Sequence, residues 1–308
     1  MKVNSLSFLE QQKYKVAIQH GYFADYDKDQ RAWKHSFVGA FIWKNPIRVK
    51  TIDIFTEVLG HIPTWEDLTD MNLEDFAEAM TTHYAANSVK NRFAEVKAVI
   101  NRHIFSVEIP SKRFSQILTA RSEPSQAIYL NEEEIERINR YVPATKEEEY
   151  VKKIFLIEAY TGARNCDAER LTPENCDMDT NLLTYISQKT KTQITLPVHR
   201  NLMRYLANPI DMEMCSFTFN KVLRQICQNC KIAERMTVFR RGKEMTAEKW
   251  EFVSSHAGRR SFATNLFLRK ADPSLIAKYM GHSSPDITMK RYIIGYIQAS
   301  TEVMKFFN

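Results

Sequence analysis

Five short motifs in the second half of the chain carry side chains that bind anions, transfer protons or act as nucleophiles. These motifs and their side chains are TGAR with Arg164, a polar hairpin segment with Lys189, HAGRR with His256 and Arg259, MGH with His282, and TMKRY with Tyr292. Arginine offers a planar fork of N–H donors to phosphate or carboxylate oxygens. Histidine and lysine can transfer protons, and a tyrosine hydroxyl can attack an electrophile. Together, these residue types suit chemistry on an anionic substrate.

Each motif also has an ordinary structural interpretation. Arg164 could form a salt bridge with Asp167, three residues on, and Lys189 could be a solvated lysine at a hairpin tip. His256 and Arg259 are three residues apart, so they share a helix face and could belong to a capped helix start. The histidine of MGH could end a helix, and the tyrosine of TMKRY could be half-buried in a core. The order and spacing of the five motifs therefore carry more information than any one of them.

That order, arginine, hairpin lysine, HxxR, GH and tyrosine, resembles the pattern of the tyrosine recombinases, the phage integrase family. TGARNCDAERL is similar to the family's TGxR segment with its following acid and leucine. HAGRRSFATNLFLRKADPSLIAKYMGHSSPDITMKRY is similar to the family's HxxR-to-tyrosine stretch almost throughout. Lys189 lies eight residues before Pro197, as the family's hairpin lysine does. The resemblance covers about 125–308, and RRGKE before SSHAGRRSFATNL is similar to integrases of conjugative transposons and related mobile elements.

The resemblance implies a site-specific DNA recombinase, or integrase, that cleaves and rejoins DNA without metal or ATP. The reaction is expected to pass through a 3′-phosphotyrosyl intermediate and a Holliday junction. The expected partner is double-stranded DNA at recombination sites, bound by a homotetramer with possible exchange of C-terminal tails. No cofactor and no membrane are expected, and the implied location is the bacterial cytoplasm, in association with the nucleoid.

The resemblance also assigns a role to each matching side chain. Arg164 and Arg259 are expected to bind the scissile phosphate and stabilise the transition state. Tyr292 is expected to be the nucleophile, and His256 to handle its proton, because a free tyrosine pKa near ~10 makes the hydroxyl weak at neutral pH. Lys189 is expected to protonate the leaving 5′-oxygen.

Three assignments keep alternatives. His282 is expected either to hydrogen-bond the same phosphate or to orient the surroundings of the nucleophile. Ten residues separate it from Tyr292, one more than the common family pattern, so Tyr296 is a rival nucleophile. Lys191 is a rival to Lys189, because alternation along a strand would place both on the same face.

The fold class predicted around these residues is mainly α with a small β-sheet, in two domains. Residues 1–108 are expected to form a SAM-like helical core-binding domain, 109–124 a linker, and 125–308 a mixed α/β catalytic domain ending in a C-terminal tail. Asn131 is a candidate cap for a helix that is rich in early acids. NLLTYISQKTKTQITLPV predicts a β-hairpin, and a weaker hairpin is predicted around Gly242.

In the first domain, TWEDLTDMNLEDFAEAMTTHY predicts a helix capped at Thr64, with a second possible start at Asp70 or Asn72. Apolar residues at helical spacing predict a further helix over 85–105.

The charge distribution predicts where DNA binds outside the reaction site. Eight acids and no Lys or Arg occur over 51–89, whereas seven Lys or Arg and two acids occur over 89–122. An ordinary solvated helix face is the alternative interpretation. The candidate backbone contacts are Lys90, Arg92, Lys97 and Arg102 on the predicted helix, with Lys112 and Arg113 in the linker.

Composition limits the other function classes. The net charge of +6 permits nucleic-acid binding without requiring it. Five cysteines without disulfide spacing fit a reducing compartment, and the pair Cys227 and Cys230 has no second pair that would complete a zinc site. Two rival functions remain, a type IB topoisomerase-like nicking and closing enzyme and a DNA-binding protein that has lost catalysis.

Overall fold

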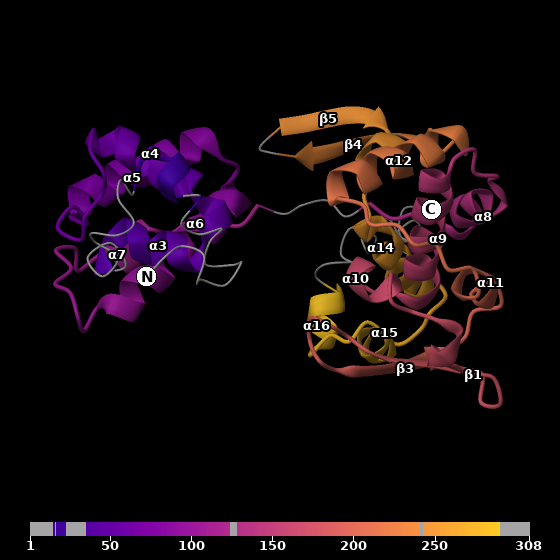
Figure 1. Cartoon of the computed structure of the whole chain (residues 1–308). Coiled ribbons are helices and arrows are strands. Elements are labelled where there is room, and N and C mark those ends of the chain that lie inside the picture. The colour runs from indigo at the N-terminus through magenta and orange to yellow at the C-terminus, as the bar shows by residue number, and fades with distance from the viewer. Residues whose placement is uncertain (1–14, 16, 23–34, 124–127, 241–242, 290–308) are drawn as a thin grey trace, which may run out of the picture. The chain divides into compact units, whose positions relative to one another are not determined.

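The chain forms two compact units, 1–124 and 125–308. A computed structural model describes residues 15, 17–22, 35–123, 128–240 and 243–289 (Figure 1). Helices predominate in the described residues of both units, and strands occur there only in the second, as two small sheets. This confirms the mainly α fold class. The predicted C-terminal tail, 293–308, lies outside the described residues.

The first unit is a bundle of helices around an aromatic core. Its helices are α3 (Phe37–Lys44), a 3-10 turn (Pro46–Arg48), α4 (Lys50–Leu59), α5 (Asp70–His83), α6 (Ala86–His103) and α7 (Phe114–Ile117). Phe55 and Phe76 are buried with their ring centroids 4.6 Å apart, and Phe37 packs edge-on against Trp65. Buried aromatic pairs of this kind supply a large share of a small core's hydrophobic stabilisation.

The helix α5 begins at the second of its two predicted starts. The Thr69 hydroxyl accepts a hydrogen bond from the Asn72 amide at 3.2 Å, which caps the helix at Asp70. Thr64 is not a helix cap, because its amide and hydroxyl both donate to the Asp67 carboxylate, at 2.8 Å each, in a turn. The same threonine–acid spacing therefore forms a local turn rather than a helix start.

Most of the segment expected to be a linker, 109–124, is packed into the first unit. Ile109, Phe114 and Leu118 are buried in its core. The Ser111 amide donates to the Leu68 carbonyl at 2.9 Å, which ties the segment to the loop before α5. Prolines and serines in this stretch favoured a linker, but three spaced apolar side chains are enough to dock it.

The second unit is arranged around the buried helix α9. Its elements are α8 (Glu132–Arg140), α9 (Lys146–Thr161), α10 (Asn165–Ala168), a 3-10 turn (Pro173–Asn175), β1 (Cys176–Asp177), β2 (Leu182–Ile186), β3 (Gln193–Pro197), α11 (Met203–Leu206), α12 (Ser216–Asn229), β4 (Arg235–Arg240), β5 (Lys243–Glu248), α13 (Lys249–Phe252), α14 (His256–Leu268), α15 (Pro273–Tyr279) and α16 (Pro285–Thr288). Helices α8, α12 and α14 pack against α9. The strands form an antiparallel sheet in the order β1-β2-β3 and a separate antiparallel pair, β4-β5. Both predicted hairpins are thereby confirmed.

The predicted cap of α8 is also confirmed. The Glu134 amide donates to the Asn131 side chain and the Asn131 amide donates to the Glu134 carboxylate, each at 2.8 Å. This reciprocal pair satisfies two donors that the first turn of a helix leaves without partners.

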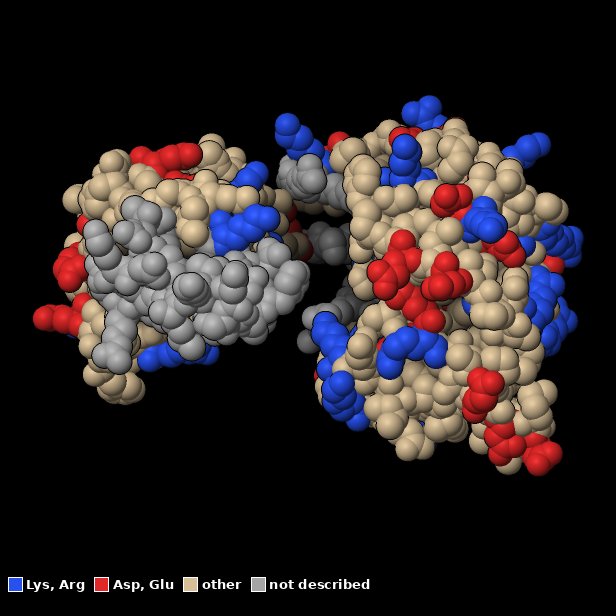
Figure 2. Space-filling view, viewed as in Figure 1, with Lys and Arg blue, Asp and Glu red and all other residues tan. Residues whose placement is uncertain are grey.

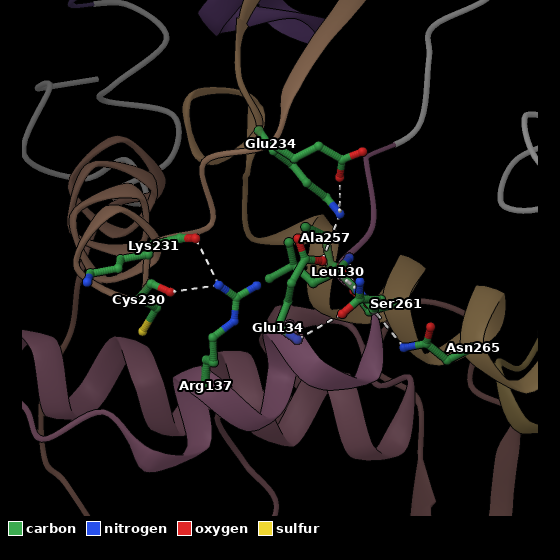
Figure 3. Close-up of polar contacts among 11 residues, drawn as sticks. Leu130, Glu134, Arg137, Cys230, Lys231, Glu234, Ala257, Ser261 and Asn265 are labelled. Atoms are coloured by element: carbon green, nitrogen blue, oxygen red, sulfur yellow. Dashed lines mark hydrogen bonds and ion pairs between the residues drawn. The ribbon is translucent and has the colours of Figure 1, made fainter.

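A buried polar network joins the start of the second unit to α14 and α13. The Ser261 hydroxyl accepts from the Leu130 amide at 2.8 Å, and the Asn265 amide group donates to the Leu130 carbonyl at 3.0 Å (Figure 3). Lys249 is 5% exposed and forms a 2.7 Å ion pair with the buried Glu134 carboxylate. The network holds α14 in register with the segment that enters the unit.

Replacing Lys249 with methionine is expected to lower the free energy of unfolding by ~3–5 kcal/mol, because the Glu134 carboxylate would remain buried without its cation. Urea unfolding of the full chain measures the loss. Lys243→Met on β5 is the matched control, since Lys243 is exposed. A loss below ~1 kcal/mol for Lys249→Met would contradict the expectation.

Candidate functional site

Arg164 is positioned by a left-handed glycine at the end of α9. Gly162 has φ +68°, which favours glycine, and a Cβ there would lie 2.5 Å from the Phe262 ring. The chain then turns so that Arg164 is the N-cap residue of α10. Its Nη1 donates to the Ser187 hydroxyl at 2.9 Å, which connects α10 to the residue that follows β2. The glycine of TGAR is therefore required by backbone geometry and by packing.

Asp167, whose side chain is 1% exposed, ties α10 to the loop that carries the lysines. Its carboxylate accepts from the Ser187 hydroxyl at 3.0 Å and from the Gln188 amide at 2.8 Å. It also forms a 2.8 Å ion pair with Arg170. Sequence reasoning considered this acid only as a salt-bridge partner for Arg164. Its place in the TGxR segment, three residues after the arginine, was the available signal for a structural role.

The two candidate lysines lie in the loop between β2 and β3, not on a strand. The loop is closed by Ser187, whose amide donates to the Thr192 carbonyl at 2.9 Å and whose carbonyl accepts from the Lys191 amide at 2.8 Å. Strand alternation therefore does not apply to Lys189 and Lys191, and the expectation that they share a strand face was wrong. Both are exposed, and Lys191 has a left-handed φ of 56°. Loop geometry rather than strand register sets the direction of each side chain.

Arg259 is held rigidly inside the second unit, at 2% exposure. Its Nη1 donates to the Gly162 carbonyl, and its Nη2 donates to the Met280 carbonyl at 2.6 Å. Nη2 also lies 2.9 Å from Nε2 of His282, whose Nδ1 lies 2.8 Å from the Thr288 hydroxyl. Because a guanidinium only donates, Nε2 of His282 must accept this bond, and the ring carries its proton on Nδ1. Arginine and histidine thus form one connected pair.

His282 is directed by the glycine before it. Gly281 has φ +60°, and a Cβ at this position would lie 2.8 Å from Cδ1 of Ile194 on β3. The turn after α15 therefore packs directly against the sheet, and its left-handed backbone favours glycine.

His256 begins α14, one turn before Arg259. The residue is exposed, yet the surrounding protein atoms and four cations lower its pKa. Desolvation contributes most, followed by Arg260, Arg259, Lys189 and Arg164. A lowered pKa favours the neutral imidazole, the form that can accept a proton.

The structure thus brings together five of the six predicted site residues, Arg164, Lys189, His256, Arg259 and His282. Tyr292 and its rival Tyr296 lie outside the described residues. The gathered side chains concentrate positive charge beside a neutral histidine. Such an arrangement can bind an oxyanion and exchange a proton with it.

Arg92, one of the predicted DNA contacts, is part of the first core. It is 9% exposed, donates to the Thr51 hydroxyl, and lies over the Tyr84 ring with 4.0 Å from its guanidinium carbon to the ring centroid. Helical spacing alone did not reveal this, because the partners come from other segments. The prediction that Arg92 contacts DNA is therefore corrected.

The other predicted contacts are more accessible. Lys90 and Arg102 are exposed and Lys97 is half-buried on α6. Lys112 donates to a backbone carbonyl at 3.1 Å, and Arg113 lies within 3.7 Å of two acids on α5. On the face drawn in Figure 2, basic and acidic side chains are interspersed over both units.

The structure also bears on the cysteines, on metal binding and on membrane insertion. All five cysteines are free thiols, with Cys227 buried and Cys230 half-buried. Within the described ranges, no cluster of His, Cys, Asp and Glu could hold a metal ion. Nor does any described helix have the length and apolarity needed to cross a membrane.

Comparisons with known proteins match the second unit to one family and the whole chain to one fold. The family model described as the phage integrase family matches residues 129–296. The integrase of transposon Tn1549, solved with circular-intermediate DNA, is 13% identical with a TM-score of 0.58, covering 97% of this chain and 99% of that chain. A lambda integrase dimer bound to a COC′ core site is 13% identical with a TM-score of 0.59, covering 92% and 96%. At such identity these likenesses concern the fold, and no curated protein matches the sequence.

Proposed function

Since the chain belongs to the phage integrase family of tyrosine-type site-specific recombinases, we propose that it cleaves and rejoins double-stranded DNA through a 3′-phosphotyrosyl intermediate and a Holliday junction. The observation that carries this proposal is the buried Arg259, bonded to the Gly162 and Met280 carbonyls and to His282. A guanidinium held in this way is preorganised for a phosphate, and reorganising it at the moment of reaction costs little.

Each side chain has a defined part in the proposed reaction. The Tyr292 oxygen attacks the scissile phosphorus while the bond from phosphorus to the 5′-oxygen breaks. Arg164 and Arg259 stabilise the charge that develops on the non-bridging oxygens. His256 takes the tyrosine proton, and Lys189 gives a proton to the leaving 5′-oxygen.

Rejoining is the same sequence in reverse, with a 5′-hydroxyl attacking the phosphotyrosine. The energy of the broken bond is kept in the protein–DNA bond, so the reaction needs no ATP. His282 maintains the orientation of Arg259, because Nε2 and Nδ1 of its ring face Arg259 and the Thr288 hydroxyl. The other role proposed for His282, a hydrogen bond to the phosphate, requires a protonated Nε2 that exchanges Arg259 for the phosphate.

The proposed partner is duplex DNA at a recombination site, with four copies of the chain assembled on two such sites. The exposed Lys90 and Arg102 of the first unit are the stronger candidates for backbone contacts. The solved integrases with this fold were captured on circular-intermediate and core-site DNA, which supports a DNA partner here. The location proposed with this partner is the bacterial cytoplasm, in association with the nucleoid.

A suicide substrate tests the proposed function. It is a candidate recombination site nicked near the cleavage point, so that the short 5′-hydroxyl strand diffuses away after cleavage. The expected result is a protein–DNA band that survives denaturant and disappears after protease treatment. Tight, salt-sensitive binding without such a band on any candidate site would favour the DNA-binding protein without catalysis. Efficient relaxation of plasmids that lack any site would favour the topoisomerase-like rival.

Replacing Arg259 with lysine is expected to slow covalent-complex formation by about 10²–10³-fold while DNA binding changes little. Lysine keeps the charge but cannot reproduce the planar fork, so it loses the contacts to Gly162 and Met280. Single-turnover cleavage and a binding titration measure the two quantities. Arg140→Lys is the matched control, since Arg140 is exposed and paired with Glu136 on α8. Equal rates for the two variants would contradict the assignment.

A further inference from the structure

Glu158 is a buried acid directly beneath the site. It lies near the end of α9, 1% exposed, and its carbonyl accepts from the Gly162 amide at 2.8 Å where the helix turns toward Arg164. One oxygen of its carboxyl group, Oε2, is buried without a hydrogen-bond partner. A buried polar atom without a partner is costly, so its presence here calls for a specific reason.

The side chain of Glu158 also meets α14 between its two site residues. A Cβ at Gly258 would lie 2.8 Å from Cβ and 2.9 Å from Oε2 of Glu158, and 3.0 Å from the Phe155 carbonyl. Gly258 therefore allows α14 to approach α9 closely at this point. Because Gly258 is next to Arg259, the contact with Glu158 sets how far that arginine stands from α9.

Asn165, the residue after Arg164, completes the arrangement. Its Nδ2 is likewise buried without a hydrogen-bond partner. It lies close enough to the Glu158 carboxyl group to lower the pKa of that group, although the two side chains do not reach full hydrogen-bond geometry. Glu158 thus touches the segments that carry both arginines.

The charge state of Glu158 follows from its surroundings. Burial raises its pKa well above the ordinary range, which outweighs the lowering by Asn165 and by Arg259 on α14. Glu169, just after α10, raises it further. Burial therefore favours the neutral form of this acid. An ionised carboxylate here would attract the charge of Arg259 inward, away from a phosphate.

We propose that Glu158 is a positioning residue for Arg164 and Arg259, and that it acts as an un-ionised carboxylic acid that spaces both arginines without neutralising them. This inference rests on the proposed function. It predicts that a neutral isostere preserves the reaction, whereas an apolar side chain of similar size does not.

The test compares Glu158→Gln and Glu158→Leu in the full chain, with cleavage of the suicide substrate measured from about pH 6 to about pH 9. Glu158→Gln is expected to cleave within about threefold of wild type near neutral pH, and Glu158→Leu at least about tenfold more slowly with DNA binding retained. At higher pH, wild type is expected to fall relative to Glu158→Gln as the carboxyl group ionises. Glu147→Gln is the matched control, an exposed acid on the same helix.

A cleavage rate for Glu158→Gln as low as that for Glu158→Leu would mean that the carboxylate is required. This result would overturn the inference and leave the proposed function intact. A wild-type cleavage rate for Glu158→Leu would mean that the Glu158 side chain only fills space, and this result would also overturn the inference. If Glu158→Leu does not fold, the rate and pH profile of Glu158→Gln decide. A wild-type chain that forms no covalent complex would overturn the proposed function first and this inference with it.

Stability provides a readout that does not depend on cleavage. A raised pKa means that the folded state holds the proton more tightly than the unfolded state, so folding weakens as pH rises above the unfolded value near ~4.3. Relative to Glu158→Gln, the unfolding equilibrium constant of wild type is expected to grow by up to about tenfold per pH unit in that window. Parallel stability curves for the two proteins would show that Glu158 is already ionised, against the inference.

Discussion

Replacing Tyr292 with phenylalanine is expected to abolish the covalent protein–DNA complex, a loss of at least about 10⁴-fold in the cleavage rate. Phenylalanine lacks the oxygen that forms the bond to phosphorus. Binding of DNA should persist, because the arginines and the first unit are unchanged. Denaturing electrophoresis of the suicide-substrate reaction measures the complex, and a titration under native conditions measures binding.

Tyr296→Phe is the matched control, since Tyr296 is the rival created by the ten-residue interval after His282. It is expected to retain the complex. A band that survives in Tyr292→Phe and is lost in Tyr296→Phe would transfer the role of nucleophile to Tyr296 and leave the reaction class intact. Survival of the band in both variants would contradict a tyrosine nucleophile at either position.

Replacing Lys189 with alanine is expected to slow strand cleavage by about 10²–10⁴-fold, the usual contribution of a general acid. The leaving 5′-oxygen is strongly basic, so it departs slowly unless a proton reaches it in the transition state. Lys189 lies in the loop tied to α10 by Asp167, and it is one of the cations that lower the pKa of His256. The charge of Lys189 therefore acts on His256 within the site.

A substrate with sulfur in place of the bridging 5′-oxygen distinguishes general acid catalysis from a structural effect. A thiolate leaves without protonation, because a thiol is far more acidic than an alcohol. Lys189→Ala should then cleave this substrate at nearly the wild-type rate, whereas Arg259→Lys should remain slow. Lys191→Ala is the control and is expected to be near wild type on both substrates. If Lys191→Ala is slow on the normal substrate and the sulfur substrate restores its rate, while Lys189→Ala behaves like wild type, the general acid is Lys191.

Local patterns in the sequence were sufficient for most of the secondary structure. The cap at Asn131 and both hairpins form where the sequence predicts them. These features depend on neighbouring residues, on alternation and on turn chemistry, which can be read along the chain.

Features that depend on distant partners were not readable in this way. The sequence around Arg92 indicates a basic surface residue. In the structure Arg92 instead contacts Thr51 and Tyr84, which belong to other segments. The expected linker docks on the first core through three apolar side chains, which its prolines and serines obscured.

The order of the site motifs identified which side chains could act together, and the resemblance supplied their expected roles. Only the folded chain revealed what holds them in place. Asp167 binds the hairpin loop from α10, and Gly258 allows Glu158 to approach Arg259. The physical reason is that the order of the motifs can be read along the sequence. Burial, hydrogen-bond partners and charge states depend instead on residues that meet only when α9, α10, α14 and the sheet pack together.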